Sequence, residues 1–299
     1  MTAHNRTIAV ANGKGGVGKT SVAINLAALV ASTGSPVLLI DLDPQGNAGE
    51  DLGYNEEGTN KTDNGKGLFE ALANGAPLAP IQEVRPNLDV LAGGDALDDL
   101  EGQLVLQSLR RGTHSLSLLA DALTPIADQY SLIVIDTPPT RPTLLQLALS
   151  ASGSVVIPTK SDRASIKGLG KLAKQMADVR ANGNNLTILG AVLYGVGSTS
   201  TSIKREAAAD IAAVMGDIAP VFETTIRHSE RTAKDVRDYG LLPHELAAEA
   251  EAAEPWWKAL KEGRAPEASV GRSAGSLASD FIQLTREVQI ALVNASERV

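Results

Sequence analysis

The sequence contains no cysteine among its 299 residues. This excludes disulfide-stapled scaffolds, catalytic thiols, cysteine-ligated zinc and iron–sulfur clusters. Aromatic residues make up only 3% and charged residues only 21%, whereas hydrophobic residues reach 43%. A chain with so few charges and so many apolar side chains is expected to fold around a large core rather than to stay disordered.

Long apolar runs are also missing. Every uninterrupted run stays well short of the roughly 18 residues that span a bilayer. The first residues, MTAHNR, do not lead a basic segment into a long apolar stretch, so we expect no secretion signal and a cytoplasmic protein. The formal net charge of −8 argues, taken as an average, against a general nucleic-acid binder.

The chain does contain a series of short apolar runs separated by helical patterns. Strands are expected over residues 7–11, 36–40, 88–91, 132–135, 154–158 and 186–193. Continuous β-branched runs are typical of parallel strands that are covered on both faces. The alternation predicts an α/β fold, with a doubly wound, mainly parallel sheet and helices on both faces. Ligands of such sheets bind beyond the carboxyl ends of the strands.

Composition also predicts how the chain is divided. Residues 54–67 are polar and glycine-rich, so we expect a mobile surface loop there. Residues 262–276 resemble a linker that precedes a last helix over residues 277–294. We therefore expect one main domain over residues 1–250 and a helical extension, residues 251–299, packed on the same domain.

A glycine-rich segment follows the first expected strand. Residues 13–20, GKGGVGKT, fit the pattern G-x-x-x-x-G-K-[ST], and a helical apolar pattern follows them. Here the glycines let backbone N–H groups surround a phosphate, and the helix N-terminus adds positive potential. Lys19 is expected to reach the β- and γ-phosphates and Thr20 to bind Mg²⁺; the alternative is a simple glycine turn. Lys14 is a second lysine inside the loop that the general pattern does not need, and it is either solvated or directed at phosphates from outside.

Three motifs together resemble the ParA/MinD family of P-loop ATPases. Residues 14–20, KGGVGKT, resemble its deviant Walker A motif. Residues 41–47, DLDPQGN, are similar to the segment after the second strand of ParA partition proteins. Residues 134–139, VIDTPP, resemble the Walker B and switch II segment. The resemblance covers roughly residues 7–245 and implies a P-loop ATPase domain.

The resemblance implies a role for each matched residue. Lys14 crosses to the partner's nucleotide in an ATP-sandwich dimer, and Lys19 holds the β- and γ-phosphates. Thr20 and Asp136 hold Mg²⁺, with Asp41 supporting them, and Asp43 positions the attacking water. Taken alone, Asp41 and Asp43 could equally be turn-forming carboxylates before Pro44. The implied nucleotide-binding set is Gly13, Lys14, Gly15, Gly16, Val17, Gly18, Lys19, Thr20 and Ser21, with ATP and Mg²⁺ as cofactors.

The resemblance also implies a biological role and its partners. It implies a DNA-partition ATPase of the small, Soj-like kind, because the first strand starts near residue 7 and leaves no room for a winged helix. The ATP-bound homodimer would bind nonspecific DNA in the nucleoid, and a ParB-type centromere-binding protein would stimulate hydrolysis. No membrane partner is expected. Basal turnover should be slow, since no arginine finger is evident beside the loop.

Local charge tests the DNA interpretation independently. Residues 160–240 contain 12 basic and 9 acidic residues, whereas the rest of the chain contains 15 and 26. Six basic residues lie where the family binds DNA: Lys204, Arg205, Arg227, Arg231, Lys234 and Arg237. Arg227, Arg231 and Lys234 recur at helical spacing, which would form a stripe for phosphate contacts. The alternative is a solvated helix face with ion pairs such as Glu230–Lys234 and Arg231–Asp235.

Two other functions remain open. A MinD-like, membrane-cycling ATPase needs a basic amphipathic C-terminal helix. Here the last helix has an apolar stripe (Phe281, Leu284, Val288, Ala291 and Leu292), but Arg286 is the single basic residue opposite, which favours packing on the core. A metabolic P-loop ligase or synthetase is disfavoured by the complete 41–47 motif. Arg141, in an unusual switch II sequence, is either directed at a phosphate or partner, or solvated.

Overall fold

The computed structural model describes residues 4–55, 62–111, 116–197, 201–215, 219–252, 261 and 273–297. The strands within these ranges are β1 (Thr7–Val10), β2 (Val37–Asp41), β3 (Ile81–Arg85), β4 (Leu88–Leu91), β5 (Leu132–Asp136), β6 (Ser154–Thr159), β7 (Thr187–Tyr194) and β8 (Val221–Ile226). The α-helices are α1 (Lys19–Ala31), α2 (Asn47–Asp51), α3 (Lys66–Asn74), α4 (Ala96–Arg111), α5 (Leu118–Leu123), α6 (Pro142–Ala151), α7 (Arg163–Ala181), α8 (Thr201–Met215), α9 (Glu230–Tyr239), α10 (Pro243–Ala252) and α12 (Ser273–Ser296). Short 3₁₀ turns, η1 (His4–Arg6) and η3 (Ala127–Gln129), precede β1 and β5.

The strands form one sheet in the order β3-β4-β2-β5-β1-β6-β7-β8. All neighbours are parallel except β3 and β4, so the predicted doubly wound, mainly parallel fold is confirmed. Asp136 at the end of β5 pairs in register with Val10 of β1 on one side and with Asp41 of β2 on the other. The register therefore brings the glycine loop and both aspartates to one edge of the sheet.

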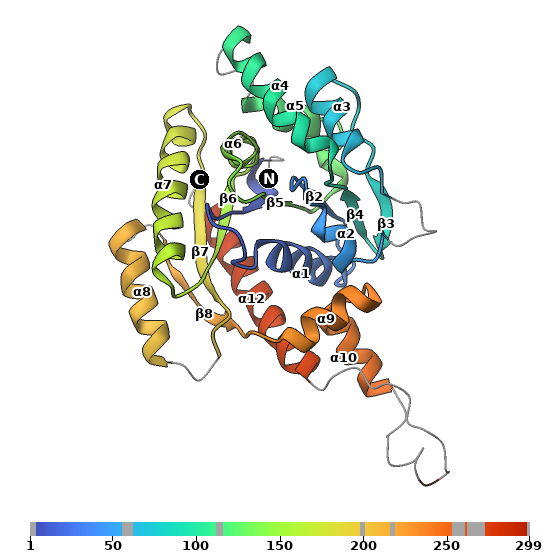
Figure 1. The fold of residues 1–299 in the computed structure, drawn as a ribbon, viewed down its shortest axis with the longest axis vertical. Helices are drawn as coiled ribbons and strands as arrows, with labels where there is room; N and C mark the ends of the chain where they lie inside the picture. The colour runs from blue at the N-terminus through green and yellow to red at the C-terminus, as the bar shows by residue number, and fades with distance from the viewer. Residues whose placement is uncertain are drawn as a thin grey trace.

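Helices cover both faces of this sheet, as Figure 1 shows. Along β1, Ile8 and Val10 belong to the apolar cluster that includes α1 and α12, whereas Ala9 belongs to the cluster that includes α3 to α8. Every residue of β1, β2 and β5 is buried, which explains why these strands read as continuous apolar runs. No helix in the described ranges is both long and apolar enough to cross a bilayer.

Two edge strands were not predicted from the sequence. β3, IQEVR, and β8, VFETTI, lie at opposite ends of the sheet and leave several side chains partly exposed. Edge strands need only one apolar face, so neither contains the continuous run that marked the central strands. The expectation of six strands was wrong for this reason.

The two segments expected to be loop and linker are more ordered at their ends than predicted. Tyr54 is buried against the cluster under α1, and α3 already begins at Lys66, so the 54–67 loop prediction is wrong at both ends. α12 begins at Ser273 and continues to Ser296, which makes the last helix longer than 277–294. Residues 56–61 of the predicted loop and 262–272 of the predicted linker lie outside the described residues.

The apolar stripe of α12 faces the core. Phe281, Leu284 and Val288 are buried in the cluster shared with α1, and Ala291 and Leu292 pack at its margin. The helix contacts α1, β7 and β8. The side of α12 that a membrane-binding helix would need is therefore already used in packing.

Candidate nucleotide-binding site

The glycine loop joins β1 to α1 and is anchored on both sides. The amide of Asn12 donates to the Pro158 carbonyl at 2.7 Å, and its oxygen accepts the backbone N–H of Lys14 at 3.0 Å. Gly16 and Gly18 adopt left-handed φ angles of 69° and 88°, which L side chains rarely adopt. Gly18 is the N-cap of α1, so no capping side chain competes for the first N–H groups of the helix.

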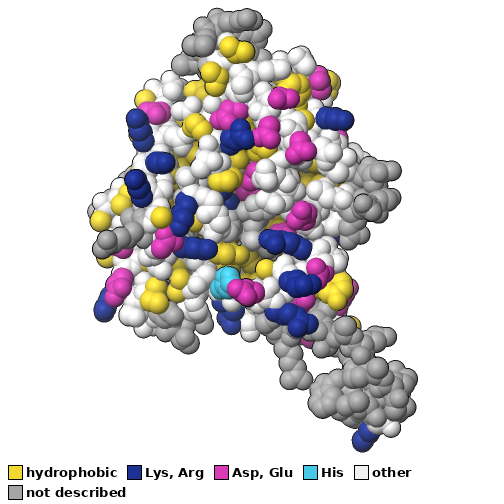
Figure 2. Space-filling model, in the orientation of Figure 1, with side chains coloured by type: hydrophobic (Ala, Val, Ile, Leu, Met, Phe, Trp, Pro, Cys, Tyr) yellow, Lys and Arg dark blue, Asp and Glu magenta, His cyan; other side chains and the backbone are white. Residues whose placement is uncertain are grey.

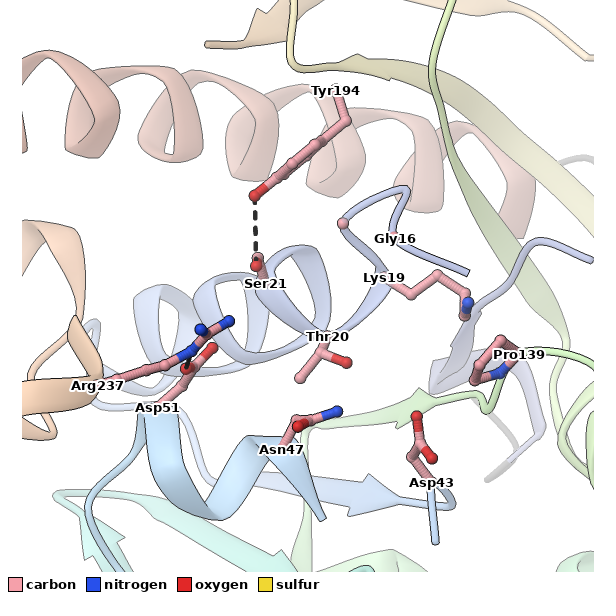
Figure 3. Close-up of a pocket in the computed structure, with 11 residues that line it drawn as sticks. Gly16, Lys19, Thr20, Ser21, Asp43, Asn47, Asp51, Pro139, Tyr194 and Arg237 are labelled. Carbon is pink, nitrogen blue, oxygen red and sulfur yellow. Dashed lines mark hydrogen bonds and ion pairs between the residues drawn. The ribbon is translucent and has the colours of Figure 1, made fainter. Parts of the chain in front are cut away.

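These N–H groups border a pocket of about 280 Å³. Figure 3 shows Lys19, Pro139 and Asp43 at one end of it, Tyr194, Asp51 and Arg237 towards the other, and Thr20 between them. Of the residues predicted to bind the nucleotide or the metal, those that line the pocket are Gly16, Gly18, Lys19, Thr20, Ser21 and Asp43. The lining does not include the others: Gly13, Lys14, Gly15, Val17, Asp41 and Asp136.

Two aspartates lie immediately behind the pocket. Asp41 and Asp136 are fully buried, and the Thr20 hydroxyl donates to Oδ2 of Asp136 at 2.6 Å. Burial raises the pKa of Asp136 to about 7, although the Thr20 hydrogen bond and Lys19 both lower it. Burial, with the charge of Asp136, raises the pKa of Asp41 well above its ordinary value. Both carboxylates are therefore costly to hold as anions unless a cation neutralises them.

The aspartates fit a magnesium ion. Oδ1 of Asp136 and Oδ2 of Asp41 are buried and have no hydrogen-bond partner. Carboxylate and hydroxyl oxygens are the ligands that Mg²⁺ prefers, and Thr20 supplies a hydroxyl beside them. The described residues contain no group of three or more acidic or histidine side chains that would hold a metal alone. That is consistent with an ion held by one or two protein ligands together with substrate phosphates.

The two lysines of the loop point in different directions. Lys19 is buried, and its Nζ donates to the Lys14 carbonyl at 3.0 Å, beside the pocket. Burial lowers the pKa of Lys19, and the charges of Asp136 and Asp43 oppose this shift. Lys14 instead donates to both oxygens of Asp162, at 2.7 and 3.0 Å, and to the Ser165 hydroxyl at 3.1 Å.

Asp162 was not predicted from the sequence. It is the N-cap of α7 and accepts the Ser165 N–H, while its contact with Lys14 holds the pKa of its carboxyl well below the usual range. An aspartate that precedes a helix is common as a cap, so the pattern alone did not reveal its second role. Lys14 is therefore held against α7 and away from its own nucleotide pocket.

Tyr194 is a second residue that was not predicted from the sequence. It ends β7, and its ring packs on Gly18, where a Cβ would lie only 2.3 Å from the ring. Its hydroxyl donates to the Ser21 hydroxyl at 3.4 Å, as Figure 3 shows. The rule that ligands bind at the carboxyl ends of strands would have flagged this position, since β7 ends there.

Arg237 lies at the nucleotide pocket. Its Nε is 3.6 Å from Oδ1 of Asp51, and both side chains line the pocket together with Ser21. Burial raises the pKa of Asp51 to about 6, although Arg237 lowers it. The family resemblance predicts Arg237 as a DNA contact, and the structure places its side chain at the border of the nucleotide pocket.

The other predicted DNA contacts are mostly engaged within the chain. Arg227 precedes α9 instead of belonging to it, so its expected helical stripe with Arg231 and Lys234 does not form. Its guanidinium makes two hydrogen bonds to Asp280 of α12, at 2.7 and 2.8 Å. Within α9, Arg231 pairs with Asp235 at 3.3 Å and Lys234 pairs with Asp238. On α8, Lys204 donates to the Glu223 carbonyl at 3.2 Å, and Arg205 is exposed.

Replacing Arg237 with Gln should weaken nucleotide binding by about fivefold, because a largely exposed guanidinium at the rim of the pocket contributes only about 1 kcal/mol. Titration with a fluorescent ATP analogue measures this. Lys234→Gln is the matched control, since Lys234 lies one turn earlier on the same helix and outside the pocket lining. Equal affinities for wild type and both variants would remove Arg237 from the nucleotide site.

A glycine loop before a helix, a buried lysine and a threonine–aspartate pair at the ends of parallel strands define a P-loop nucleoside triphosphatase. Residues 5–188 match the family model described as an AAA domain. The chain is 33% identical over 233 residues to the chromosome partitioning protein ParA of Caulobacter vibrioides. The aligned region covers 77% of this chain and 83% of that protein. It belongs to the ParA/Soj family of ATPases.

A second relative agrees with this assignment, and a solved structure shares the fold. The chromosome-partitioning ATPase Soj of Thermus thermophilus is 34% identical over 235 residues, 78% of this chain and 86% of that protein. The solved structure of apo McdA from Cyanothece superposes with a TM-score of 0.72 over 96% of this chain and 99% of the other. At 22% identity, that likeness concerns the fold alone.

Proposed function

We propose that the protein is a DNA-partition ATPase that binds ATP and Mg²⁺, dimerises face to face and then holds nonspecific DNA in the nucleoid. A ParB-type centromere-binding protein would stimulate hydrolysis and so release the dimer. Family membership supports the partition role and the ATPase activity.

The position of Lys14 carries the proposal. The general phosphate loop needs one lysine, and Lys19 occupies that place beside the pocket. Lys14 has a charged side chain on the same loop, directed outward to Asp162 at the surface. A lysine so placed is available to a nucleotide bound by a second copy of the chain. Hydrolysis would then require dimerisation, because the charge that completes the site comes from the partner.

Each remaining residue has a role in phosphoryl transfer, a reaction that depends mainly on positioning and charge neutralisation. Lys19 and the N–H groups of α1 hold the phosphates. Thr20 and Asp136 hold Mg²⁺, which when bound neutralises the charge that develops on the phosphate oxygens. Asp43 faces the pocket from the segment after β2 and accepts the Gln45 N–H at 3.0 Å, which fixes its carboxylate for orienting water.

A slow basal rate is expected. Arg141, the basic residue of switch II, pairs with Asp98 and with Glu101 of α4, the latter at 3.0 Å, so it is engaged within the chain. It therefore does not act as an arginine finger in this arrangement. A stimulating partner would have to supply an arginine of its own or free Arg141 from Asp98 and Glu101.

The test of this function is ATP-dependent binding of arbitrary duplex DNA in a gel-shift assay. We expect a shift with ATP and Mg²⁺ and none with ADP, and Lys14→Gln should abolish the shift while the monomer still binds ATP. Sedimentation with anionic vesicles is the parallel assay for a membrane-cycling ATPase. ATP-dependent sedimentation with vesicles, without DNA binding, would contradict the partition proposal and favour a membrane-cycling ATPase.

A further inference from the structure

The basic side chains around α9 are almost all neutralised by nearby carboxylates. Four ion pairs do this: Arg227–Asp280, Arg231–Asp235, Lys234–Asp238 and Arg237–Asp51. Helix α9 itself contains three basic and three acidic residues, so its net charge is zero. Binding DNA phosphates there would first require these pairs to open, which leaves acidic groups beside the DNA.

Helix α7 has the opposite character. It contains five basic residues and one acidic residue. Lys167, Lys171 and Lys174 follow the i, i+4, i+7 spacing that places side chains on one face of a helix, and all three are exposed. None of the ion pairs found among the described residues includes them. Figure 2 shows Lys and Arg side chains gathered along the side of the molecule where α7 lies in Figure 1.

We propose that these three lysines, the α7 lysine face, bind the phosphate backbone of DNA. The inference rests on the proposed DNA-partition function and moves the DNA contact from α9 and α8 to α7. Charged side chains that form no internal ion pair release DNA counterions on binding without first breaking one. This separates the α7 lysine face from the four basic residues around α9, Arg227, Arg231, Lys234 and Arg237, which are all in ion pairs.

The geometry suits a DNA strand. Lys167 and Lys174 are seven residues apart, about 10 Å at a rise of 1.5 Å per residue, which spans roughly three nucleotides of one strand at 3.4 Å each. The helix sequence, RASIKGLGKLAKQMADVRA, has no aromatic residue, and none of the exposed large hydrophobic side chains of the described residues belongs to α7. Protein partners anchor mainly on aromatic and apolar side chains, so a polyanion is favoured over an acidic protein.

The same helix is linked directly to the phosphate loop. Asp162, the N-cap of α7, holds Lys14, and Gly168 in the second turn of α7 packs on the loop. A Cβ at Gly168 would lie 2.8 Å from Oδ1 of Asn12 and 3.2 Å from Cβ of Lys14. When Lys14 leaves Asp162 for a phosphate, the first turn of α7 loses its ion pair. The position of the α7 lysine face can therefore depend on whether Lys14 contacts Asp162 or a phosphate.

The experiment compares two charge-matched triple variants of the full-length protein. One replaces Lys167, Lys171 and Lys174 with Gln, and the other replaces Arg205, Arg231 and Lys234 with Gln. Binding of a fluorescent, random-sequence duplex is measured by anisotropy with ATP and Mg²⁺ at several salt concentrations. Binding of a fluorescent ATP analogue and a circular dichroism spectrum confirm that each variant is folded and takes up nucleotide.

We expect the α7 variant to bind DNA at least about tenfold more weakly and to lose roughly 2 to 3 from the slope of log affinity against log salt, close to one per lost phosphate contact. The control variant should stay within about threefold of wild type, because two of its three charges, Arg231 and Lys234, are already paired with carboxylates. Equal losses in both variants, or a loss confined to the control, would overturn the placement on α7.

Other outcomes also separate the possibilities. If the α7 variant binds DNA normally but no longer responds to a stimulating partner protein, the lysine face is a protein-binding surface and the proposal is wrong. If wild type binds DNA but neither variant changes this, the contact lies elsewhere and the proposal is again wrong. If wild type binds no DNA with ATP, the proposed function itself fails.

Discussion

Lys19→Ala is expected to lose ATP affinity by about 100-fold or more, since charge-assisted hydrogen bonds to phosphate contribute roughly 3 kcal/mol. Lys19 is buried at the pocket end that also contains Asp43 and Pro139, and Asp136 lies behind it. Removing its charge also leaves Asp43 and Asp136 facing the phosphates without compensation. Titration with a fluorescent ATP analogue measures the loss directly.

Two controls separate lost binding from lost folding. Burial lowers the pKa of Lys19, and the charges of Asp136 and Asp43 oppose this shift, so the charge of Lys19 is not what holds the nucleotide-free protein together. A circular dichroism melting curve should show that the variant is still folded. Lys14→Ala changes the other lysine of the loop, which points to Asp162, and should bind ATP nearly as well as wild type. Wild-type ATP affinity in Lys19→Ala would mean that the loop does not hold the phosphates.

Asp43→Ala is expected to slow ATP hydrolysis by about 100-fold or more while leaving ATP affinity within a few-fold of wild type, because positioned bases and water-orienting groups contribute roughly 10²–10⁴ to rates. Asp43 lines the pocket opposite the phosphate loop, and the Gln45 N–H fixes its carboxylate. Single-turnover hydrolysis measures the rate, and the trapped ATP state should remain bound to DNA.

Asp43→Asn is the matched control for the backbone. Its side-chain oxygen can still accept the Gln45 N–H, so the local structure is kept and only the charge is lost. We expect Asn to be nearly as slow as Ala, because the carboxylate orients the water. Hydrolysis at close to the wild-type rate in both variants would show that another group performs this step.

The central strands could be predicted well, because their burial on both faces is visible directly in the sequence. Strands such as β1, β2 and β5 are buried on both faces and therefore form continuous apolar runs. The register then brings Val10, Asp41 and Asp136 side by side, as expected of carboxyl ends in a parallel sheet. Edge strands β3 and β8 lack that signal, since one side of each is only partly buried.

The pairing of charges could not be predicted, because it depends on tertiary contacts. The spacing predicts Arg227 as part of a basic stripe. In the structure it pairs with Asp280, which lies 53 residues further along the chain, too far for the sequence pattern to reveal. Arg237 of α9 pairs with Asp51 of α2 at one end of the pocket, and Lys14 pairs with Asp162 at the start of α7. The alternative of a helix face with internal ion pairs was correct for Arg231 and Asp235, which are close in sequence.

Sedimentation velocity of the slow-hydrolysing Asp43→Ala protein, with Mg²⁺ and either ATP or ADP, tests the central claim most directly. The claim is that Lys14 leaves Asp162 to complete the nucleotide site of a second copy. We predict a dimer with ATP, a monomer with ADP, and a monomer under both conditions when Lys14→Gln is added. A protein that stays monomeric with ATP, or a dimer that forms unchanged without Lys14, would contradict the account.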